Sequence, residues 1–347
     1  MTCAKTRLGV IGLGMGMGHV EGYRQCPDAE LVALCDRDEA WLAERGAQLG
    51  VSRLFTDYRE LLAAPNLDAV SVCLPTVLHA EVTIAALQRG KHVLCEKPMA
   101  LNATEARAMA DAAAAAGRVL MVSQNRRFIA EAQYLHRLVS DGQLGRVYFV
   151  RAGWRRPMGM LPSPTTQRGS GVVNRNWFNQ SQTGGGALRD LGSHMLDLSL
   201  WLMGFPEVAE AVGASFSAFL PAWAQQHGET ADAEDLATGM ISFRDGSALQ
   251  LEASFGSYVE REVIFVELYG TLGGASWRDG LKVFRGEPGA FSTDIKRVVS
   301  EGGSAQAEFV RAIRSGEPPS VTPQQSVAVI ELLDRLYAGG ITTLQAD

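Results

Sequence analysis

Three polar residues lie at helical spacing in an otherwise apolar segment that runs from Gly184 to Gly204. Asp190, His194 and Asp197 are four and three positions apart. Steps of about 100° per residue place all three on one stripe of a helix. Burying carboxylates and an imidazole without a use for them would be costly, so the stripe predicts a site of acid–base chemistry.

A lysine beside a glutamate is the second candidate. A short apolar run after Gly90 reads as a strand that ends in Glu96-Lys97-Pro98. Ligands bind outside the carboxyl ends of strands in open α/β sheets, so Lys97 is placed to donate to a substrate hydroxyl. From these residues alone, a solvated Glu–Lys pair at the start of a helix is an equal alternative.

A glycine-rich turn follows the first predicted strand. The run LGVIGLGMGMGH ends at His19, and such a turn lets backbone N–H groups approach a pyrophosphate at a helix N-terminus. The third glycine of the usual fingerprint falls on Met17, although Gly16 and Gly18 flank it. The candidate phosphate-binding residues are Gly12, Leu13, Gly14, Met15 and Gly16.

An acidic residue ends the second predicted strand. Asp36 follows Gly12 by 24 positions, where its carboxylate would accept hydrogen bonds from a ribose and repel a 2′-phosphate. This favours NAD, while the adjacent Arg37 keeps NADP open. Further cofactor candidates lie at other strand ends, namely Pro75, Thr76, His79, Glu96 and Lys97.

The elements that must position these residues change character along the chain. Short apolar strands alternate with helices up to residue 123, which predicts a doubly wound parallel sheet, a Rossmann domain over residues 1–123. Residues 124–347 carry neighbouring strands with few helices, which predicts an α+β domain with a mainly antiparallel sheet. The strands predicted in the first domain are Arg7–Ile11, Ala29–Cys35, Arg53–Phe55, Ala69–Leu74, Lys91–Leu94 and Val119–Val122.

A long stretch, Arg155–Thr183, is rich in Gly, Pro, Ser and Asn and reads as irregular. Stretches of that length are uncommon unless they form a functional loop or a lid. We expect substrate recognition there and on the polar or aromatic residues near it. The substrate candidates are Arg127, Trp154, Trp177 and Asp197, and for Asp197 a structural hydrogen bond is an equal alternative.

Composition excludes several classes of function. A net charge of -6 over 347 residues gives no electrostatic footprint for nucleic acid or an anionic membrane. No apolar run approaches the roughly 18 residues of a membrane helix, and the first strand begins too early for a signal peptide. The five cysteines lack metal-ligand spacing, so we expect reduced thiols, no metal site and a cytoplasmic location.

Taken together, these motifs resemble the Gfo/Idh/MocA family of glucose–fructose oxidoreductase-like and inositol dehydrogenase-like proteins. The resemblance rests on the glycine turn, Asp36, Pro75 with His79, Glu96-Lys97-Pro98, Arg127-Phe128 and the Asp190…His194 helix behind three glycines. It implies a Rossmann domain, a second domain whose open sheet serves as an oligomer interface in a homodimer or homotetramer, and a frequent cis peptide at Lys97–Pro98. The family's lysine, catalytic histidine and helix aspartate map on Lys97, His194 and Asp190.

The resemblance implies an NAD(P)-dependent dehydrogenase of a sugar, inositol or related polyol. Histidine suits the role of base because its ordinary pKa lies near neutrality, and a lysine can polarise the same oxygen. Two alternatives stay open: a redox-neutral glycosidase or epimerase that retains NAD, and a regulator that senses NAD(P) or a sugar. The sequence does not distinguish the sugar or the direction of the reaction.

Overall fold

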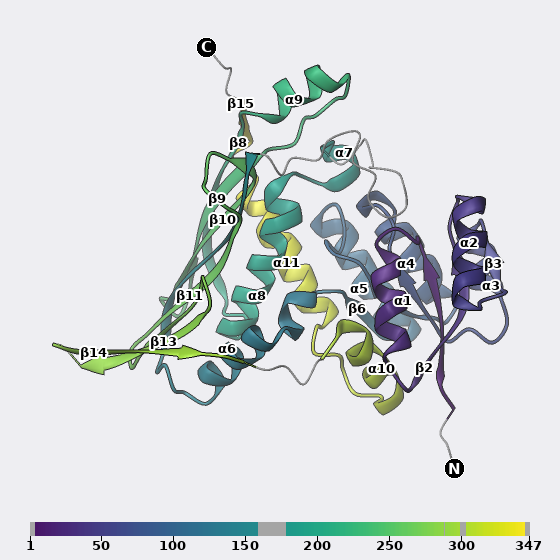
Figure 1. Ribbon diagram of the computed structural model, residues 1–347, viewed down its shortest axis with the longest axis horizontal. Helices are drawn as coiled ribbons and strands as arrows, with labels where there is room; N and C mark the ends of the chain where they lie inside the picture. The colour runs from purple at the N-terminus through teal and green to yellow at the C-terminus, as the bar shows by residue number, and fades with distance from the viewer. Residues whose placement is uncertain (1–3, 159–177, 288, 299–302, 344–347) are drawn as a thin grey trace. The chain divides into compact units, whose positions relative to one another are not determined.

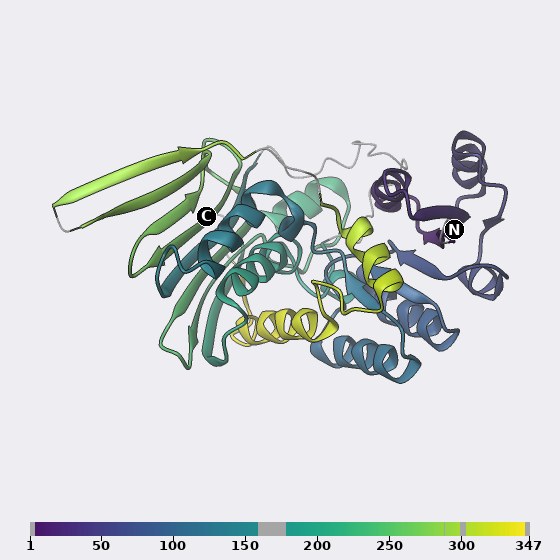
Figure 2. The same cartoon turned by 90° about the horizontal axis from the view of Figure 1, so that it is seen from below.

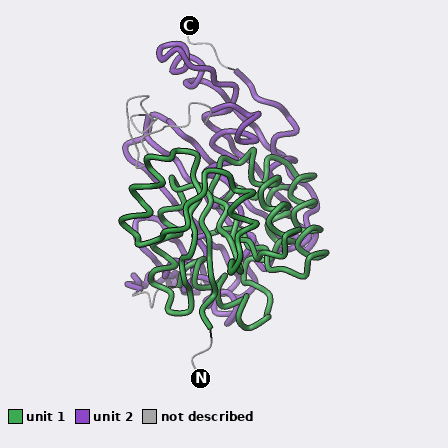
Figure 3. The backbone as a smooth tube through the Cα atoms, turned by 90° about the vertical axis from the view of Figure 1, so that its right-hand side faces the viewer, with its two compact units in different colours: residues 1–124, 165–174, 303–330 green, residues 125–164, 175–302, 331–347 purple. Residues whose placement is uncertain are grey.

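The computed structural model describes residues 4–158, 178–287, 289–298 and 303–343. By their contacts these residues divide into two compact units, which Figure 3 colours separately. Unit 1 contains residues 4–124 and 303–330, and unit 2 contains the described residues of 125–298 and 331–343. The sequence assigned 303–330 to the second domain, whereas their contacts lie within unit 1.

Unit 1 is built on a six-stranded parallel sheet with the order β3-β2-β1-β4-β5-β6. Its strands are β1 (Thr6–Ile11), β2 (Ala29–Cys35), β3 (Leu54–Phe55), β4 (Ala69–Val72), β5 (His92–Cys95) and β6 (Leu120–Val122). The side chains of β4 are buried along its whole length, because a parallel sheet is covered on both faces. The predicted parallel sheet is confirmed.

Helices connect these strands and cover the sheet. They are α1 (Gly16–Arg24), α2 (Glu39–Leu49), α3 (Tyr58–Ala63), α4 (His79–Gln88), α5 (Ala103–Ala116) and α10 (Ala305–Ser315). The ends of α5 follow the sequence signals: the Asn102 side chain accepts from the N–H of Glu105, and Gly117 adopts a φ of 60°. Helix α10 returns late in the chain to contact α1, β1 and β5.

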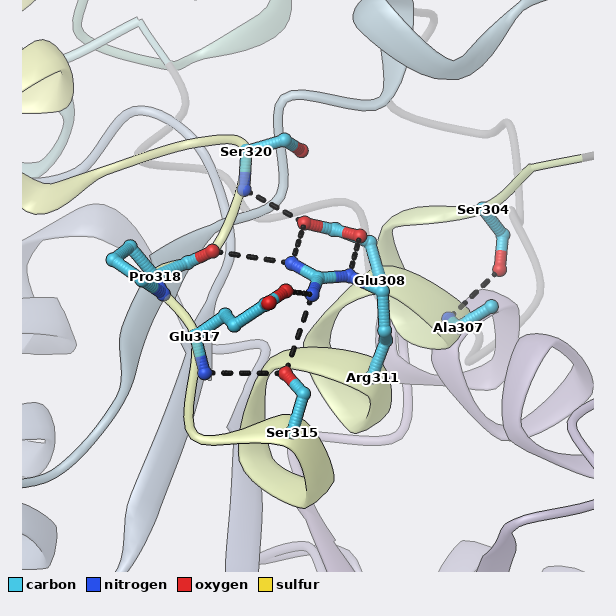
Figure 4. Close-up of polar contacts among 8 residues, drawn as sticks. All are labelled: Ser304, Ala307, Glu308, Arg311, Ser315, Glu317, Pro318 and Ser320. Atoms are coloured by element: carbon cyan, nitrogen blue, oxygen red, sulfur yellow. Dashed lines mark hydrogen bonds and ion pairs between the residues drawn. The ribbon is translucent and has the colours of Figure 1, made fainter.

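The segment after α10 is fixed by one arginine (Figure 4). Arg311 donates to both carboxylate oxygens of Glu308, at 2.8 and 2.9 Å, and to Glu317 and the carbonyl of Pro318. Burial opposes ionisation of Glu308, but the hydrogen bond from Arg311 lowers the pKa of this carboxyl overall. The same carboxylate accepts the N–H of Ser320 at 2.7 Å. These bonds hold the turn that leads from α10 into α11 (Pro323–Leu336).

Unit 2 is built on a nine-stranded sheet with the order β14-β13-β12-β11-β7-β10-β9-β8-β15. All neighbouring strands are antiparallel except the pairs β7–β10 and β8–β15. The strands are β7 (Val147–Pro157), β8 (Val208–Ser217), β9 (Leu236–Phe243), β10 (Ala248–Ser257), β11 (Val263–Gly270), β12 (Gly274–Trp277), β13 (Leu281–Glu287), β14 (Ala290–Lys296) and β15 (Ile341–Thr343).

One face of this sheet is covered by helices. The segment η4 (Leu188–Gly192) and the helix α8 (Ser193–Met203) contact β7 and β10, as Figures 1 and 2 show. Other α-helices described in the unit are α6 (Ala130–Ser140), α7 (Gln180–Thr183), α9 (Leu220–His227) and the part of α11 from Glu331 onward. In the described residues no helix is both long enough and apolar enough to span a membrane.

Two expectations about unit 2 need correction. The irregular stretch does not begin at Arg155, because β7 continues to Pro157 by pairing with β10 and β11, and helix α7 occupies its last residues. Strands β13 and β14 were not predicted: β13 buries only Leu281 and Val283, and β14 is exposed along nearly its whole length. The turn at Asp245-Gly246 joins β9 to β10.

Candidate active site

The glycine turn has the close approaches that a phosphate-binding turn requires. Gly12 has a φ of 90°, and a Cβ there would collide with the carbonyl oxygen of Cys73. Helix α1 begins at Gly16, where a Cβ would lie 2.7 Å from the side chain of Val10. Gly16 therefore provides the tight helix–strand packing that the fingerprint assigns to the next position. Met15 is exposed at this helix N-terminus.

Asp36 is fixed at the end of β2. Its Oδ2 accepts the N–H of Leu13 at 2.7 Å, and its Oδ1 accepts the N–H of Asp38 at 3.1 Å. The carboxylate is therefore oriented beside the glycine turn, while Arg37 is exposed next to it. The Leu13 N–H is already used by this bond. A glycine turn of this kind, with the Asp36 carboxylate beside it, fits a dinucleotide.

His79 braces two loops of unit 1. Pro75 and Thr76 are accessible in the turn after β4, but the His79 ring is only 1% exposed. Its Nδ1 and Nε2 each lie 2.8 Å from a backbone carbonyl oxygen, that of Pro98 and that of Leu74. The sequence placed His79 among the cofactor contacts, whereas the structure uses both ring nitrogens to hold the loops together.

The environment of His79 favours its charged form. Burial alone would lower the pKa of His79, but the Cys95 sulfur and the two carbonyl oxygens raise it to about 9. Both ring nitrogens then act as donors.

Lys97 follows β5 in the same loop. The Lys97–Pro98 peptide bond is cis, as the resemblance implied. The N–H of Lys97 donates to Glu96 Oε2 at 3.0 Å, and Glu96 Oε1 lies 2.7 Å from His19 Nε2 on α1. Burial opposes ionisation of Glu96, but His19 and Lys97 lower the pKa of its carboxyl overall. An anion is thus held one residue before the lysine.

The segment with Asp190 begins with an unusual turn. Leu188–Gly192 is π-helical, so Asp190 lies on a wider turn than the regular helix that the sequence predicted. The N-terminus is capped by Glu234, whose Oε2 and Oε1 accept the N–H groups of Gly186 and Leu188, both at 2.8 Å. Burial raises the pKa of Glu234, against the effect of the hydroxyl of Tyr337, which donates to Oε1 at 2.7 Å.

The glycines before this turn are explained by the cap. A Cβ on Gly185 would collide with the Tyr337 hydroxyl, and one on Gly186 would collide with the Glu234 carbonyl. Only glycine lets the chain pass so close to both groups. Gly185 and Gly186 are therefore required by the close packing at the start of η4.

His194 lies against an aromatic and cationic cluster within unit 2. Its ring centroid is 5.6 Å from that of Trp154, and the guanidinium carbons of Arg126 and Arg156 lie 4.5 and 5.1 Å from the Trp154 ring centroid. The Trp154 indole donates to Glu262 at 2.7 Å. Burial lowers the pKa of Arg126, against the effect of the Glu262 charge. Trp154 is thus next to His194, as a substrate wall would require.

Arg127 and Asp197 form a buried ion pair. Arg127 Nε and Nη2 donate to the two oxygens of Asp197 at 2.8 and 2.6 Å, and each side chain is 1% exposed. The sequence predicted that both side chains contact the substrate, whereas in the structure they contact each other. The hydrogen bond foreseen for Asp197 joins α8 to the short helix η2 (Asn125–Phe128) rather than to its own helix.

The structure groups the predicted site residues in two places. Unit 1 holds the glycine turn, Asp36 and Lys97 at the carboxyl ends of its strands, and unit 2 holds His194 with Trp154. Trp177 lies outside the described residues, together with most of the Arg155–Thr183 stretch. Among the described residues no cluster of His, Cys, Asp and Glu could hold a metal ion.

Sequence reasoning missed the residues that support these groups. They are Ser71 and Tyr23, which bond near His19, and Glu234 and Tyr337, which cap η4. One signal was available, since His19 and Tyr23 are four apart on the buried face of α1, the spacing that singled out Asp190 and His194. No local pattern links Glu234 to Gly186 across 48 positions.

Comparisons with known proteins agree with this architecture. Residues 6–124 match the model of the GFO_IDH_MocA oxidoreductase family with an NAD-binding Rossmann fold, and residues 132–276 match the GFO/IDH/MocA C-terminal domain. The chain is 31% identical to D-glucoside 3-dehydrogenase of Escherichia coli, over 99% of this chain and 97% of that protein. It is 30% identical to myo-inositol 2-dehydrogenase of Thermotoga maritima, over 91% and 90%.

A solved structure extends the likeness to the fold. GenD2 from gentamicin A biosynthesis, solved in complex with NAD, is 28% identical, with a TM-score of 0.78 over 97% of this chain and 94% of that one. The matched domains, the identity along the whole length and the dinucleotide cradle lead to one conclusion. This chain belongs to the Gfo/Idh/MocA family of NAD-binding oxidoreductases.

Proposed function

We propose that this enzyme interconverts a secondary alcohol and a ketone on a sugar, an inositol or a related polyol, with Lys97 and His194 as its acid–base pair. The names of the relatives, a glucoside 3-dehydrogenase and an inositol 2-dehydrogenase, both refer to a ring hydroxyl. Each of these proteins is matched along at least nine-tenths of its length. Their shared chemistry supports a polyhydroxylated ring as the substrate.

One observation carries the proposal: the lysine and the cofactor residues follow parallel strands at the same edge of the unit 1 sheet. Gly12 follows β1, Asp36 follows β2, Pro75 comes shortly after β4 and Lys97 follows β5. In a sheet with this strand order, the crevice between β1 and β4 is the topological switch point where a dinucleotide binds. Lys97 is one strand away from it.

The residues present would divide the chemistry as follows. The glycine turn, Asp36 and the loops after β4 and β5 would hold NAD, which accepts or returns the hydride when bound. Lys97 would donate to the alcohol oxygen and stabilise its developing negative charge. His194 would take the hydroxyl proton, with Asp190 one turn away to orient the imidazole or to bind a neighbouring hydroxyl. Asp36 favours NAD over NADP, because a 2′-phosphate would meet its carboxylate.

The second half of the chain would supply the substrate wall. We assign dinucleotide binding to residues 1–123 and substrate binding to residues 124–347, with Trp154 and Trp177 as walls. Reduced cysteines support a cytoplasmic location: Cys26, Cys35, Cys73 and Cys95 are free thiols.

The open face of the nine-stranded sheet would pair with a second copy of the chain. Val212 and Met240 are neighbours on this face and are 60% and 46% exposed, and Tyr269 lies on the same face of β11. Exposed apolar side chains on one face of a sheet are typical of an interface. Light scattering of the purified protein measures whether it is a dimer or a tetramer.

The decisive experiment follows NADH formation at 340 nm with NAD⁺ and a panel of glucosides, inositols and free sugars. We expect turnover with at least one ring alcohol and a loss of kcat/KM of about 10²–10⁴-fold in Lys97→Met and in His194→Asn. The matched controls are Lys282→Met and His227→Asn, which remove the same side chains elsewhere. Both controls should keep their activity.

Other outcomes would select another function. Cleavage or inversion of the sugar without accumulation of NADH would indicate the redox-neutral enzyme. Binding of NAD and sugar without any conversion would indicate a regulator. Full activity in Lys97→Met would show that this lysine is not part of the acid–base pair.

A further inference from the structure

The backbone N–H groups at the start of the helix that carries His194 are bonded by two residues that are distant in the chain. Those of residues 186–188 bond Glu234: the first and third donate to its carboxylate oxygens, both at 2.8 Å, and the second donates to its carbonyl oxygen at 3.2 Å. The N–H of Arg189 donates to the Tyr337 hydroxyl at 3.1 Å. The next N–H, of residue 190, bonds within the helix, to the carbonyl oxygen four positions earlier at 2.9 Å. The N–H groups that a helix start leaves without intrahelical acceptors are thus satisfied from outside the helix.

Glu234 and Tyr337 therefore hold this helix start in one conformation. Glu234 lies just before β9 and is fully buried, and its Oε1 also accepts the Tyr337 hydroxyl at 2.7 Å. A carboxylate at a helix N-terminus is favoured by the helix dipole, and a buried N–H that loses its acceptor is costly. The conformation that these bonds fix is the π-helical turn of η4.

This turn leaves one side chain of the segment accessible. Of residues 185–200, all of which the structure describes, Asp190 alone is not buried. Its neighbours Arg189 and Leu191 are 3% and 2% exposed, and Arg189 Nη2 donates to Asp334 at 2.6 Å. Successive residues of a regular helix lie about 100° apart, and a π turn takes up one additional residue. The type of turn therefore decides which of these three neighbouring side chains is accessible.

We propose that Glu234 is a positioning residue that places Asp190 on the accessible side of the helix. It acts through the backbone, by fixing the π turn from 48 positions away along the chain. This inference rests on the proposed function, in which Asp190 orients the His194 imidazole or binds a neighbouring hydroxyl. It adds that the register of Asp190 is set by a carboxylate that touches neither of these groups.

Glu234→Gln keeps the size of the side chain and removes one acceptor. An amide has one acceptor oxygen, so its NH2 group meets a backbone N–H where the carboxylate accepted one. The turn then relaxes toward a regular helix or opens locally. In either case the side chain at position 190 becomes less distinct from its buried neighbour at position 191.

The first test measures accessibility and requires no substrate. The reporter variants Asp190→Cys and Leu191→Cys are alkylated with iodoacetamide, and peptide mass spectrometry gives each rate relative to the free thiol Cys26 in unit 1. The measured quantity is the relative rate at position 190 divided by that at position 191. We expect Glu234→Gln to lower this ratio about fivefold, the factor that corresponds to loss of one hydrogen bond.

Two further variants frame this result. Tyr337→Phe removes only the acceptor of the Arg189 N–H and the donor to Oε1, and should lower the ratio about twofold, so it carries the test if Glu234→Gln does not fold. Glu308→Gln is the matched control, because it makes the same substitution at a hydrogen-bonded carboxylate of unit 1. It should leave the ratio unchanged.

The second test uses a ring alcohol that the enzyme oxidises. Glu234→Gln should lower kcat/KM about tenfold in the native background and less than about twofold in the Asp190→Asn background. A residue that acts through Asp190 has nothing left to position once that carboxylate is gone. A residue that merely stabilises the fold would reduce kcat/KM equally in both backgrounds.

The inference is overturned by an equal loss of kcat/KM in both backgrounds. It is also overturned if the labelling ratio stays unchanged in the folded variants while their melting temperatures fall, since that is the result of a purely structural role. The labelling ratio is separate from the sugar panel. A fall of the ratio without any sugar turnover would reject the proposed function and keep the placement of Asp190 by Glu234.

Discussion

The surroundings of Lys97 and of His194 are built from different interactions. In unit 1 the lysine loop is held by neutral and charged side chains in sequence, from Tyr23 through His19 to Glu96. In unit 2 the histidine helix is held by the carboxylate of Glu234 on backbone N–H groups and by an ion pair to Asp197. The first arrangement acts on the orientation of side chains, whereas the second fixes the path of the backbone.

This difference follows from the elements that carry each group. A lysine at a strand end lies on a loop, and only its neighbours can hold it in place. A histidine inside a helix is positioned by the helix itself, so the supports of His194 act on the helix ends and faces. Substitutions near Lys97 should therefore change reactivity, while those near His194 should mainly change stability.

The largest effect is expected from the ion pair on the histidine helix. Asp197→Asn leaves the Arg127 charge buried without a full partner and should lower the free energy of unfolding of unit 2 by about 3–5 kcal/mol. Chemical denaturation followed by tryptophan fluorescence measures this loss. NADH affinity should change little, since the cofactor residues lie in unit 1.

The matched control replaces both charges. In the double variant Arg127→Met, Asp197→Leu, apolar groups of similar size fill the site, and most of the stability should return. If the double variant were as unstable as Asp197→Asn, the loss would come from packing rather than from the unpaired charge.

A smaller effect, confined to alkaline pH, is expected from His79, whose ring contacts the loop that contains Lys97. The pKa of His79 in the folded protein is about 9, above its ordinary value of 6.5, so its stabilisation is complete below pH 6.5 and is lost as the pH rises through 9. The free energy of unfolding should fall by at most about 1.4 kcal/mol per pH unit in that window. Urea denaturation at a series of pH values measures this slope.

His79→Gln removes the titrating group and should flatten the slope between pH 6.5 and 9. The exposed His227 provides the control, since His227→Gln should leave the slope as it is. Equal slopes in wild type and His79→Gln would show that this ring is neutral in the folded protein.

The smallest effect is expected at the cap of η4. Tyr337→Phe removes the hydroxyl that donates to Glu234 at 2.7 Å and accepts the N–H of Arg189 at 3.1 Å. The loss should be about 1–2 kcal/mol, because one buried carboxylate oxygen keeps only its backbone donor. Thermal unfolding measures it, with the exposed Tyr258→Phe as control. A change in NADH affinity would contradict the division between the two regions.

Local signals were sufficient for most of unit 1. The alternation of apolar strands and capped helices predicted its parallel sheet, and Asn102 and Gly117 marked the ends of one helix correctly. These signals work because central parallel strands such as β4 and β5 are buried on both faces and are therefore mostly apolar. Unit 2 was predicted less completely: the edge strand β14, which is exposed along nearly its whole length, was missed.

The candidate site shows the same limit. Residue type and spacing selected Lys97 and His194 as candidates, yet they did not distinguish Asp197 in an ion pair from Asp197 in contact with a substrate. The partner, Arg127, is 70 positions away, and no periodicity reports such a distance.

The amino-acid sequence by itself determined which groups are candidates for the chemistry, because a glycine turn, an acidic strand end and a lysine before proline are local patterns that need only their neighbours. The tertiary structure alone decided how these groups are supported. Glu234 reaches the start of η4, and His19 reaches Glu96, only after strands and helices distant in the chain have packed together. Burial then makes each of these polar contacts obligatory, since a carboxylate or imidazole removed from water must find its partner within the fold.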